Sequence, residues 1–119
     1  MADRRLRSPA FARNIAPIRD ALAPLVAGRT GRALEIASGP GEHAAALAAA
    51  FPDLDWTPSD PEPAHCASVD AWAKAFGLAN LRAARTLDAS GDWAAQVADR
   101  APFELVLAVN LLHVAPWRV

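Results

Sequence analysis

Apolar residues along the chain form short runs that alternate between strand-like and helix-like segments. Strand-length apolar runs occupy residues 33–37, 54–59, 81–87 and 103–114, and the last of these is the most apolar and the best candidate for a central strand. The intervening helices are expected over 42–51, from a cap at Asp60 to about Phe76, and from 88-DASGDW-93 to about Ala98. Strands that alternate with helices predict parallel pairing and right-handed crossovers. The expected fold class is therefore α/β, a doubly wound parallel sheet of about four strands.

A helical lead-in is expected before the first strand, over residues 8–27. Ser8 is a suitable N-cap and Pro9 fits the first turn, while Pro17 and Pro24 are expected to kink or split the helix. The turn 28-GRTG-31 then closes the segment. This pattern divides the chain into a lead-in, residues 1–31, and a sheet-forming part, residues 32–119.

Composition narrows the class of protein further. A chain of 119 residues with 53% hydrophobic and 21% charged residues has the size and composition of one soluble globular domain. The net charge of −1 offers no basic field for nucleic acid. The single cysteine, Cys66, excludes an internal disulfide and fits a reducing, cytoplasmic setting. No apolar run is long enough for a membrane span, and the arginine-rich start lacks the apolar segment of a signal peptide.

The stretch 33-ALEIASGPGEHAA-45 contains the most specific pattern, a carboxylate followed by a glycine pair. Residues 39–44 fit G-x-G-x-x-A, the dinucleotide fingerprint, and Asp60 lies near the spacing of a ribose-binding acid. The same residues fit acid-x-x-x-G-x-G with Glu35 as the acid, the first motif of S-adenosylmethionine-dependent methyltransferases.

Charges beside the loop favour the second interpretation. A pyrophosphate needs bare, positive amides at a helix N-terminus. Glu35 and Glu42 flank the loop, and each like-charge contact at ~4 Å costs on the order of 4 kcal/mol at an effective dielectric of ~20. S-adenosylmethionine carries an ammonium and no phosphate, so an acid near the loop attracts it, directly or through a water. A competing interpretation of Glu35 is a carboxylate that caps a neighbouring helix.

Four segments together resemble the Rossmann-like class I methyltransferases and, more narrowly, the methyltransferase-like 26 family. These segments are ALEIASGPGEHA, WTPSDPEP, LDASGDW and NLLHVAPW, and SPAFARNIAPI resembles the lead-in of that family. The resemblance implies an S-adenosylmethionine-dependent methyltransferase with a seven-stranded sheet, of which this chain carries the first half and its cofactor site. A fourth strand at the edge of such a half-sheet would be apolar and prone to self-association.

The resemblance also assigns a cofactor site, residue by residue. It implies that Glu35, Ala37, Ser38, Gly39 and Gly41 surround the methionine part of the cofactor. Asp60 is expected to accept both ribose hydroxyls, Asp88 and the Ala89 amide to meet the adenine, and Asn110 to lie beside the methyl donor. Ala37 replaces a glycine of many class I enzymes, which requires a backbone that does not need positive φ.

Other candidate residues carry weaker signals. His113, three residues after Asn110, is either a general base or a residue that packs at the end of the fourth strand. Arg13 and Asn14 form either a lid over the cofactor or a solvated helix face. His43 is expected to orient the loop, Trp72 to lie in the core, and Trp93 or Trp117 to border a pocket. His65 and Cys66 lack further ligands at zinc spacing, so no metal is expected.

Three functions remain open from the sequence. They are an S-adenosylmethionine-dependent methyltransferase or a fragment of one, a nicotinamide-binding oxidoreductase half-domain, and a non-catalytic module that keeps the fold. The later strands of class I methyltransferases shape the substrate pocket, so the methyl acceptor is not readable from these residues.

Overall fold

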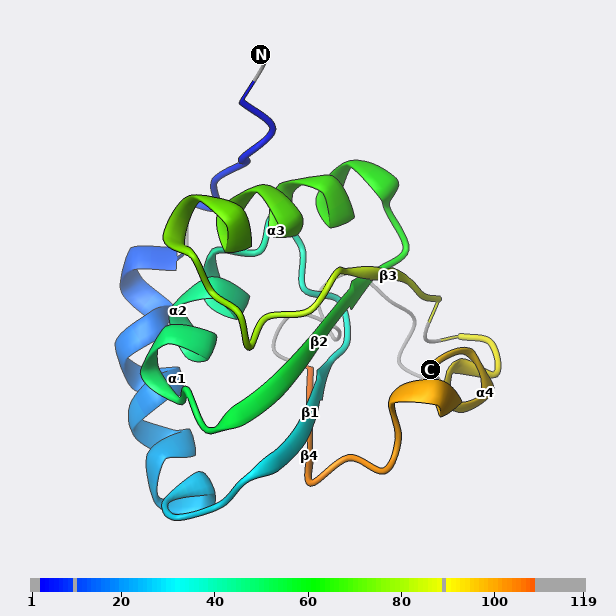
Figure 1. The fold of residues 1–119 in the computed structure, drawn as a ribbon. Coiled ribbons are helices and arrows are strands. Elements are labelled where there is room, and N and C mark those ends of the chain that lie inside the picture. Colours follow the sequence, from blue (N-terminus) through cyan, green and yellow to red (C-terminus); the bar gives the residue numbers. More distant parts are fainter. Residues whose placement is uncertain (1–2, 10, 89, 109–119) are drawn as a thin grey trace.

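The computed structural model describes residues 3–9, 11–88 and 90–108 (Figure 1). Its elements follow in the order α1 (Phe11–Val26), β1 (Gly31–Glu35), α2 (Glu42–Ala50), β2 (Leu54–Asp60), α3 (Pro63–Phe76), β3 (Arg85–Thr86), α4 (Trp93–Gln96), a 3-10 helix η1 (Ala98–Arg100) and β4 (Leu105–Leu107). The expected α/β class and the order of helices and strands are confirmed.

The strands form one parallel sheet in the order β3-β2-β1-β4. Ala33 of β1 lies opposite Trp56 of β2 on one side and Leu105 of β4 on the other. The chain therefore moves outward from β1 to β3 and then returns to the far side of β1. This reversal places a topological switch point between β1 and β4, where ligands bind in open α/β sheets.

Two expected strands differ from the observed ones. The third strand, expected over 81–87, is reduced to β3 and an isolated bridge between Trp56 and Leu81. Between these two points the Ala84 amide donates to the Asp70 carboxylate of α3 at 2.8 Å, which takes it out of the strand ladder. The fourth strand, expected over 103–114 and as the best candidate for a central strand, is β4, Leu105–Leu107, in the described part of the chain. There it lies at the end of the sheet, and β1 and β2 are central.

Helix α1 runs without a break through Pro17 and Pro24, so the expectation that they split the helix is wrong. Pro17 and Pro24 each remove one backbone hydrogen bond, and both lie on the exposed side of the helix. The opposite side carries an apolar stripe at helical spacing that packs on the core: Ile15, Ile18, Leu22 and Val26. Tertiary packing of this stripe outweighs the lost backbone bonds.

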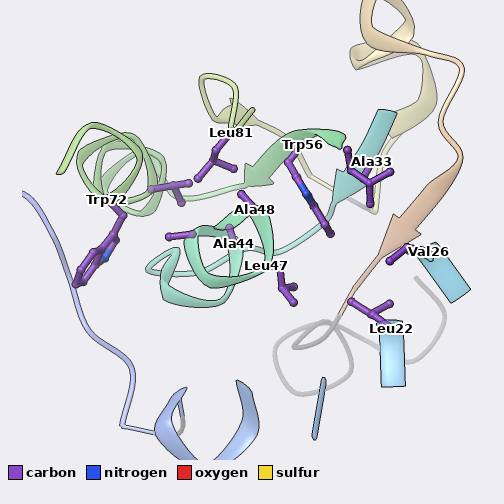
Figure 2. Close-up of a cluster of buried hydrophobic side chains, with 12 residues drawn as sticks. Leu22, Val26, Ala33, Ala44, Leu47, Ala48, Trp56, Trp72 and Leu81 are labelled. Atoms are coloured by element: carbon purple, nitrogen blue, oxygen red, sulfur yellow. The ribbon is translucent and has the colours of Figure 1, made fainter. Parts of the chain in front are cut away.

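The larger core fills the space between α1, α2, α3 and one face of the sheet (Figure 2). Trp56 and Leu47 are fully buried there, and Trp72 lies in the same cluster, as predicted. A smaller cluster on the other face joins β1 to the α4 region through Leu34, Leu87 and Val97. The alanines of α2 let the helix approach the sheet closely.

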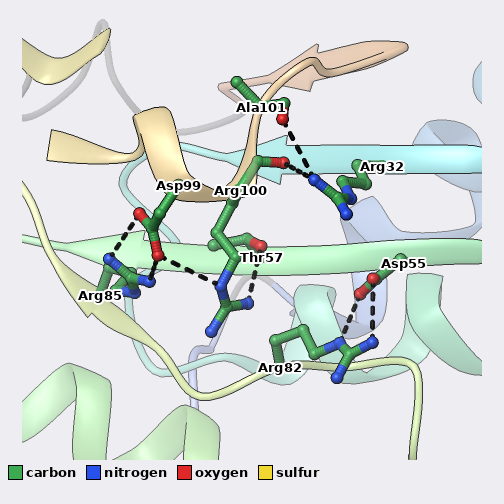
Figure 3. Close-up of polar contacts among 8 residues, drawn as sticks. All are labelled: Arg32, Asp55, Thr57, Arg82, Arg85, Asp99, Arg100 and Ala101. Atoms are coloured by element: carbon green, nitrogen blue, oxygen red, sulfur yellow. Dashed lines mark hydrogen bonds and ion pairs between the residues drawn. The ribbon is translucent and has the colours of Figure 1, made fainter. Parts of the chain in front are cut away.

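Polar contacts fasten the segment around η1 to the sheet (Figure 3). The Arg100 guanidinium donates to the Thr57 hydroxyl at 3.3 Å, and Asp99 pairs with Arg85. Arg32 donates to the carbonyl oxygens of Arg100 and Ala101 at 3.0 and 3.1 Å. These contacts fix the connection that leads from β3 to β4. Among the described helices, none combines the length and the apolar character needed to cross a bilayer.

Candidate cofactor site

The loop after β1 is held between the two neighbouring strands. The Ile36 amide donates to the Leu107 carbonyl of β4, and the Ser38 amide donates to the Ser59 carbonyl of β2, both at 2.8 Å. Ser59 returns a bond, since its amide donates to the Ser38 hydroxyl at 3.1 Å. The loop thus extends the sheet by one step at the switch point, so its position is set by the strands.

Ala37 adopts a left-handed conformation with φ of 57°. The sequence predicted that the backbone at Ala37 does not need a positive φ, and this prediction is wrong. For a non-glycine residue this conformation costs roughly 1–2 kcal/mol. Ala37 is buried against Leu34, Ile36 and Val97, and the loop bonds on either side hold the backbone in this strained state.

Replacing Ala37 with glycine should raise the melting temperature by about 2–5 °C. Relief of the left-handed strain exceeds the entropy that glycine adds to the unfolded chain, which is about 0.4–1 kcal/mol. Thermal unfolding followed by circular dichroism measures the change. Ala49→Gly, at an exposed helical position of α2, should lower the melting temperature instead; a lower value for Ala37→Gly as well would show that the loop is unstrained.

The two loop glycines serve different purposes. A Cβ on Gly39 would meet no atom within 4 Å, so this glycine leaves open space above the loop. A Cβ on Gly41 would lie 2.6 Å from Val69 Cγ2 and 2.8 Å from Val69 Cα of α3. Gly41 is therefore required for the close packing of α2 on α3, and Gly39 for access to the loop backbone.

Asp60, at the end of β2, is buried and links the loop to α3. Its Oδ1 accepts from the Gly39 amide at 2.9 Å. Its Oδ2 accepts from the Glu62 amide at 3.0 Å and lies 2.8 Å from His65 Nδ1. A carboxylate offers about four acceptor positions, so one remains beyond these three contacts.

Glu35 places a second carboxyl beside Asp60, in the interior of the protein. Its side chain is only 2% exposed, and its Oε1 meets no hydrogen-bond donor among the described residues. Burial raises the pKa of Glu35 to about 7. The negative charge of Asp60 also raises this pKa, whereas the Ser38 side chain, as a hydrogen-bond donor, lowers it. This carboxyl caps no helix in the described chain; it is a buried acid without a cation.

Asp88 follows the third strand on the same edge of the sheet. The Leu87 amide just before it donates to the Asp60 carbonyl at 3.1 Å, which brings the ends of β2 and β3 together. The Asp88 carboxylate accepts from the amide and hydroxyl of Ser90 at 2.9 and 2.6 Å. These bonds lower the pKa of Asp88 and keep its carboxylate ionised.

The structure thus brings together Glu35, Ala37, Ser38, Gly39, Gly41 and Asp60, with Asp88 beside them. The expected roles of Ala89, Asn110, His113 and Trp117 fall outside the described residues. Arg13 and Asn14 lie exposed on α1, and their role as a lid stays a prediction. Trp93 packs against the smaller core cluster next to the loop.

Comparison with known families covers nearly the whole chain. Residues 5–119 match the family described as "Protein of unknown function (DUF938)". The chain belongs to the DUF938 family. Among solved structures it is similar to the selenomethionine-substituted CurJ carbon methyltransferase, with a TM-score of 0.61 and 22% identity over 84% of this chain. The match covers 26% of the CurJ chain, so the DUF938 chain corresponds to about a quarter of that structure and shares its fold.

Two residues of the DUF938 chain differ in role from what its sequence suggested. Glu42 lies in the first turn of α2, as expected, but its carboxylate accepts from the Ser8 amide of the N-terminal segment. His43 is buried and packs edge-on against Phe11 at 5.2 Å, and its Nε2 has no partner among the described residues. Burial lowers the pKa of His43, so the ring is neutral. Glu42 is thus engaged by the N-terminal segment, whereas Glu35 and Asp60 are the buried carboxyl groups at the loop.

Proposed function

We propose that the chain binds S-adenosylmethionine at the carboxyl ends of β1, β2 and β3 and belongs to a methyltransferase. The buried Glu35 carboxyl carries this proposal, because it lies beside the loop and its Oε1 meets no donor among the residues that the structure describes. Burial of a lone carboxyl is unfavourable unless a donor or a cation satisfies it. The ammonium of S-adenosylmethionine has the charge and the donors that such a carboxyl lacks.

Asp60 supports the ribose half of the proposed site. Its Oδ1 already accepts from the Gly39 amide and retains one acceptor position, which suffices for one ribose hydroxyl and not for both of those expected from the sequence. Asp88 stays ionised next to it and is proposed to accept from the adenine amino group. From their positions in the sequence, we propose that the Ala89 amide contacts the adenine and that Asn110 lies beside the methyl donor.

The carboxyl groups at the loop, together with two engaged loop amides, argue against a dinucleotide. A pyrophosphate is bound by free backbone amides at a helix N-terminus. In the turn before α2, the Ser38 amide is bonded to the Ser59 carbonyl and the Gly39 amide to the Asp60 carboxylate, so only amides at the start of α2 remain for a phosphate. A phosphate at this loop would also face two carboxyl side chains, Glu35 and Asp60. The oxidoreductase alternative is therefore not proposed.

Bound S-adenosylmethionine supplies a methyl group activated by its sulfonium. The residues of this chain would bind and orient the cofactor. We also propose that the chain is related to the methyltransferase-like 26 family. We propose a cytoplasmic location as well, because the single cysteine, Cys66, is free and buried.

Replacing Asp60 with alanine should lower the affinity for S-adenosylhomocysteine at least about tenfold. A hydrogen bond to a charged group contributes roughly 1.5–3 kcal/mol, and 1.4 kcal/mol corresponds to a factor of ten. Isothermal titration calorimetry measures this, with Asp53→Ala in the exposed turn before β2 as the control.

Asp60→Asn keeps the shape of the side chain and one acceptor, and should give an intermediate loss. Circular dichroism establishes that each variant is folded. If the folded Asp60→Ala protein binds S-adenosylhomocysteine with unchanged affinity, the ribose does not bind at Asp60.

A further inference from the structure

An N-terminal strap, residues 3–9, lies against α3 before the chain enters α1 (Figure 1). The Leu6 amide donates to the Ser68 hydroxyl at 2.8 Å, and the Trp72 indole donates to the Leu6 carbonyl at 3.0 Å. The guanidinium groups of Arg5 and Arg7 lie 5.1 and 5.0 Å from the centre of the Trp72 ring. The strap is thus held by backbone hydrogen bonds and by cation–π contacts.

Ser68 extends these contacts to the cofactor loop. Its side chain is fully buried, and its hydroxyl donates to the Pro40 carbonyl at 2.5 Å while it accepts from Leu6. Pro40 lies between the two loop glycines. A single hydroxyl therefore joins the strap to the loop, and hydrogen bonds in such a chain reinforce one another.

A second contact reaches the other side of the loop. The Ser8 amide donates to the carboxylate of Glu42, which follows Gly41 at the start of α2. The strap consequently touches both the middle of the loop, through Ser68, and its exit. Nothing in the local sequence of the loop indicates this support, because the partners are 34 and 62 residues apart.

The strap buries little apolar surface of its own. A half-open, mostly apolar pocket of about 360 Å³ adjoins it, lined by Arg7 of the strap and by residues of α1, α2 and α3 that include Phe11, Ala46 and Phe76. The Leu6 side chain is 42% exposed. Segments with few buried apolar contacts open at low free energy, so the discrete polar contacts decide whether the strap is docked.

We propose that Ser68 is a positioning residue for the cofactor loop and that docking of the strap and binding of the cofactor favour each other. The docked strap orients the Ser68 hydroxyl, and this hydroxyl fixes Pro40 and the backbone of the neighbouring glycines. By linkage, a ligand that requires the ordered loop strengthens strap docking by the same factor. The cofactor part of this inference rests on the proposed function; the positioning of the loop does not.

A matched pair at Leu6 separates the backbone contact from the side chain. Leu6→Pro removes the amide that donates to Ser68, whereas Leu6→Ala keeps the amide and removes only the partly exposed side chain. In the cofactor-free protein, Leu6→Pro and Ser68→Ala should each raise hydrogen exchange at the Gly39 and Gly41 amides about fivefold, the factor expected for one hydrogen bond. Leu6→Ala should leave it unchanged, and the double variant Leu6→Pro/Ser68→Ala should exceed neither single one. Unchanged exchange in Leu6→Pro and Ser68→Ala would overturn the inference.

Coupling to the cofactor is tested by titration of the same variants with S-adenosylhomocysteine. Leu6→Pro should weaken binding about fivefold relative to Leu6→Ala, and the ligand should slow exchange of the Leu6 and Ser8 amides in the wild-type chain. Equal affinity in the two Leu6 variants would overturn the coupling. A wild-type chain that binds no S-adenosylhomocysteine but whose loop exchange responds to Leu6→Pro would refute the proposed function and uphold the positioning role of Ser68.

Discussion

Glu35→Gln should make the cofactor-free protein more stable at pH 8 by on the order of 2–3 kcal/mol. The folded-state pKa of Glu35 is raised from 4.5 to about 7, chiefly by burial, so the neutral acid is the form that the fold tolerates. The contribution of the protonated Glu35 carboxyl to the free energy of unfolding is therefore fully present below pH 4.5 and is lost as the pH rises through 7. Each unit of this shift corresponds to about 1.4 kcal/mol. Glutamine keeps the shape and cannot ionise.

Urea unfolding at pH 5, 6, 7 and 8 measures the effect. The free energy of unfolding of the variant minus that of the wild type should grow with pH and level off above pH 7. Glu104→Gln, at an exposed position before β4, should show no such trend. A difference that does not change between pH 5 and 8 would mean that Glu35 has an ordinary pKa and no buried, unsatisfied carboxylate.

Gly41→Ala should destabilise the fold by about 2–5 kcal/mol, and Gly39→Ala by only about 1–2 kcal/mol. Both positions have positive φ, at 94° and 59°, which costs an alanine roughly 1–2 kcal/mol. Only Gly41 also meets Val69 backbone and side-chain atoms within 3 Å. Relief of that overlap requires α2 and α3 to separate, at a typical overpacking cost of about 1–3 kcal/mol.

Chemical denaturation of the two variants measures the difference directly. Gly39→Ala should remain folded yet bind S-adenosylhomocysteine more weakly, because its new methyl group projects into the space above the loop. Equal stability losses at the two positions would show that the contact between Gly41 and Val69 is not tight. Undiminished binding by Gly39→Ala would place the cofactor away from this loop.

The order of elements was predictable because each start and stop has a local cause. Gly77 ends α3 in a left-handed C-cap, and Pro63 begins it at the first turn. The parallel sheet followed from the alternation of strands and helices. The length of β3 was not predictable, since the Ala84 amide is diverted to Asp70, a tertiary contact. The continuity of α1 across two prolines likewise depends on packing against the core.

Part of the candidate site was predictable because its residues lie at or just after the ends of strands. Glu35, Gly39 and Asp60 lie at strand ends, and parallel strands bring these ends together. The left-handed conformation of Ala37 was missed because no local residue signals it; the strand bonds on both sides impose it. Glu42 lies at the start of α2 as expected, but its contact with the Ser8 amide was missed because the two residues are far apart in the sequence.

The central claim is that this loop selects S-adenosylmethionine and not a dinucleotide. Calorimetric titration of the wild-type chain with S-adenosylhomocysteine, and in parallel with NAD, tests it most directly. We expect saturable one-site binding of S-adenosylhomocysteine and no heat of binding with NAD. Binding of NAD, or a folded chain that binds neither ligand, would contradict the assignment of Glu35 and Asp60 to an S-adenosylmethionine site.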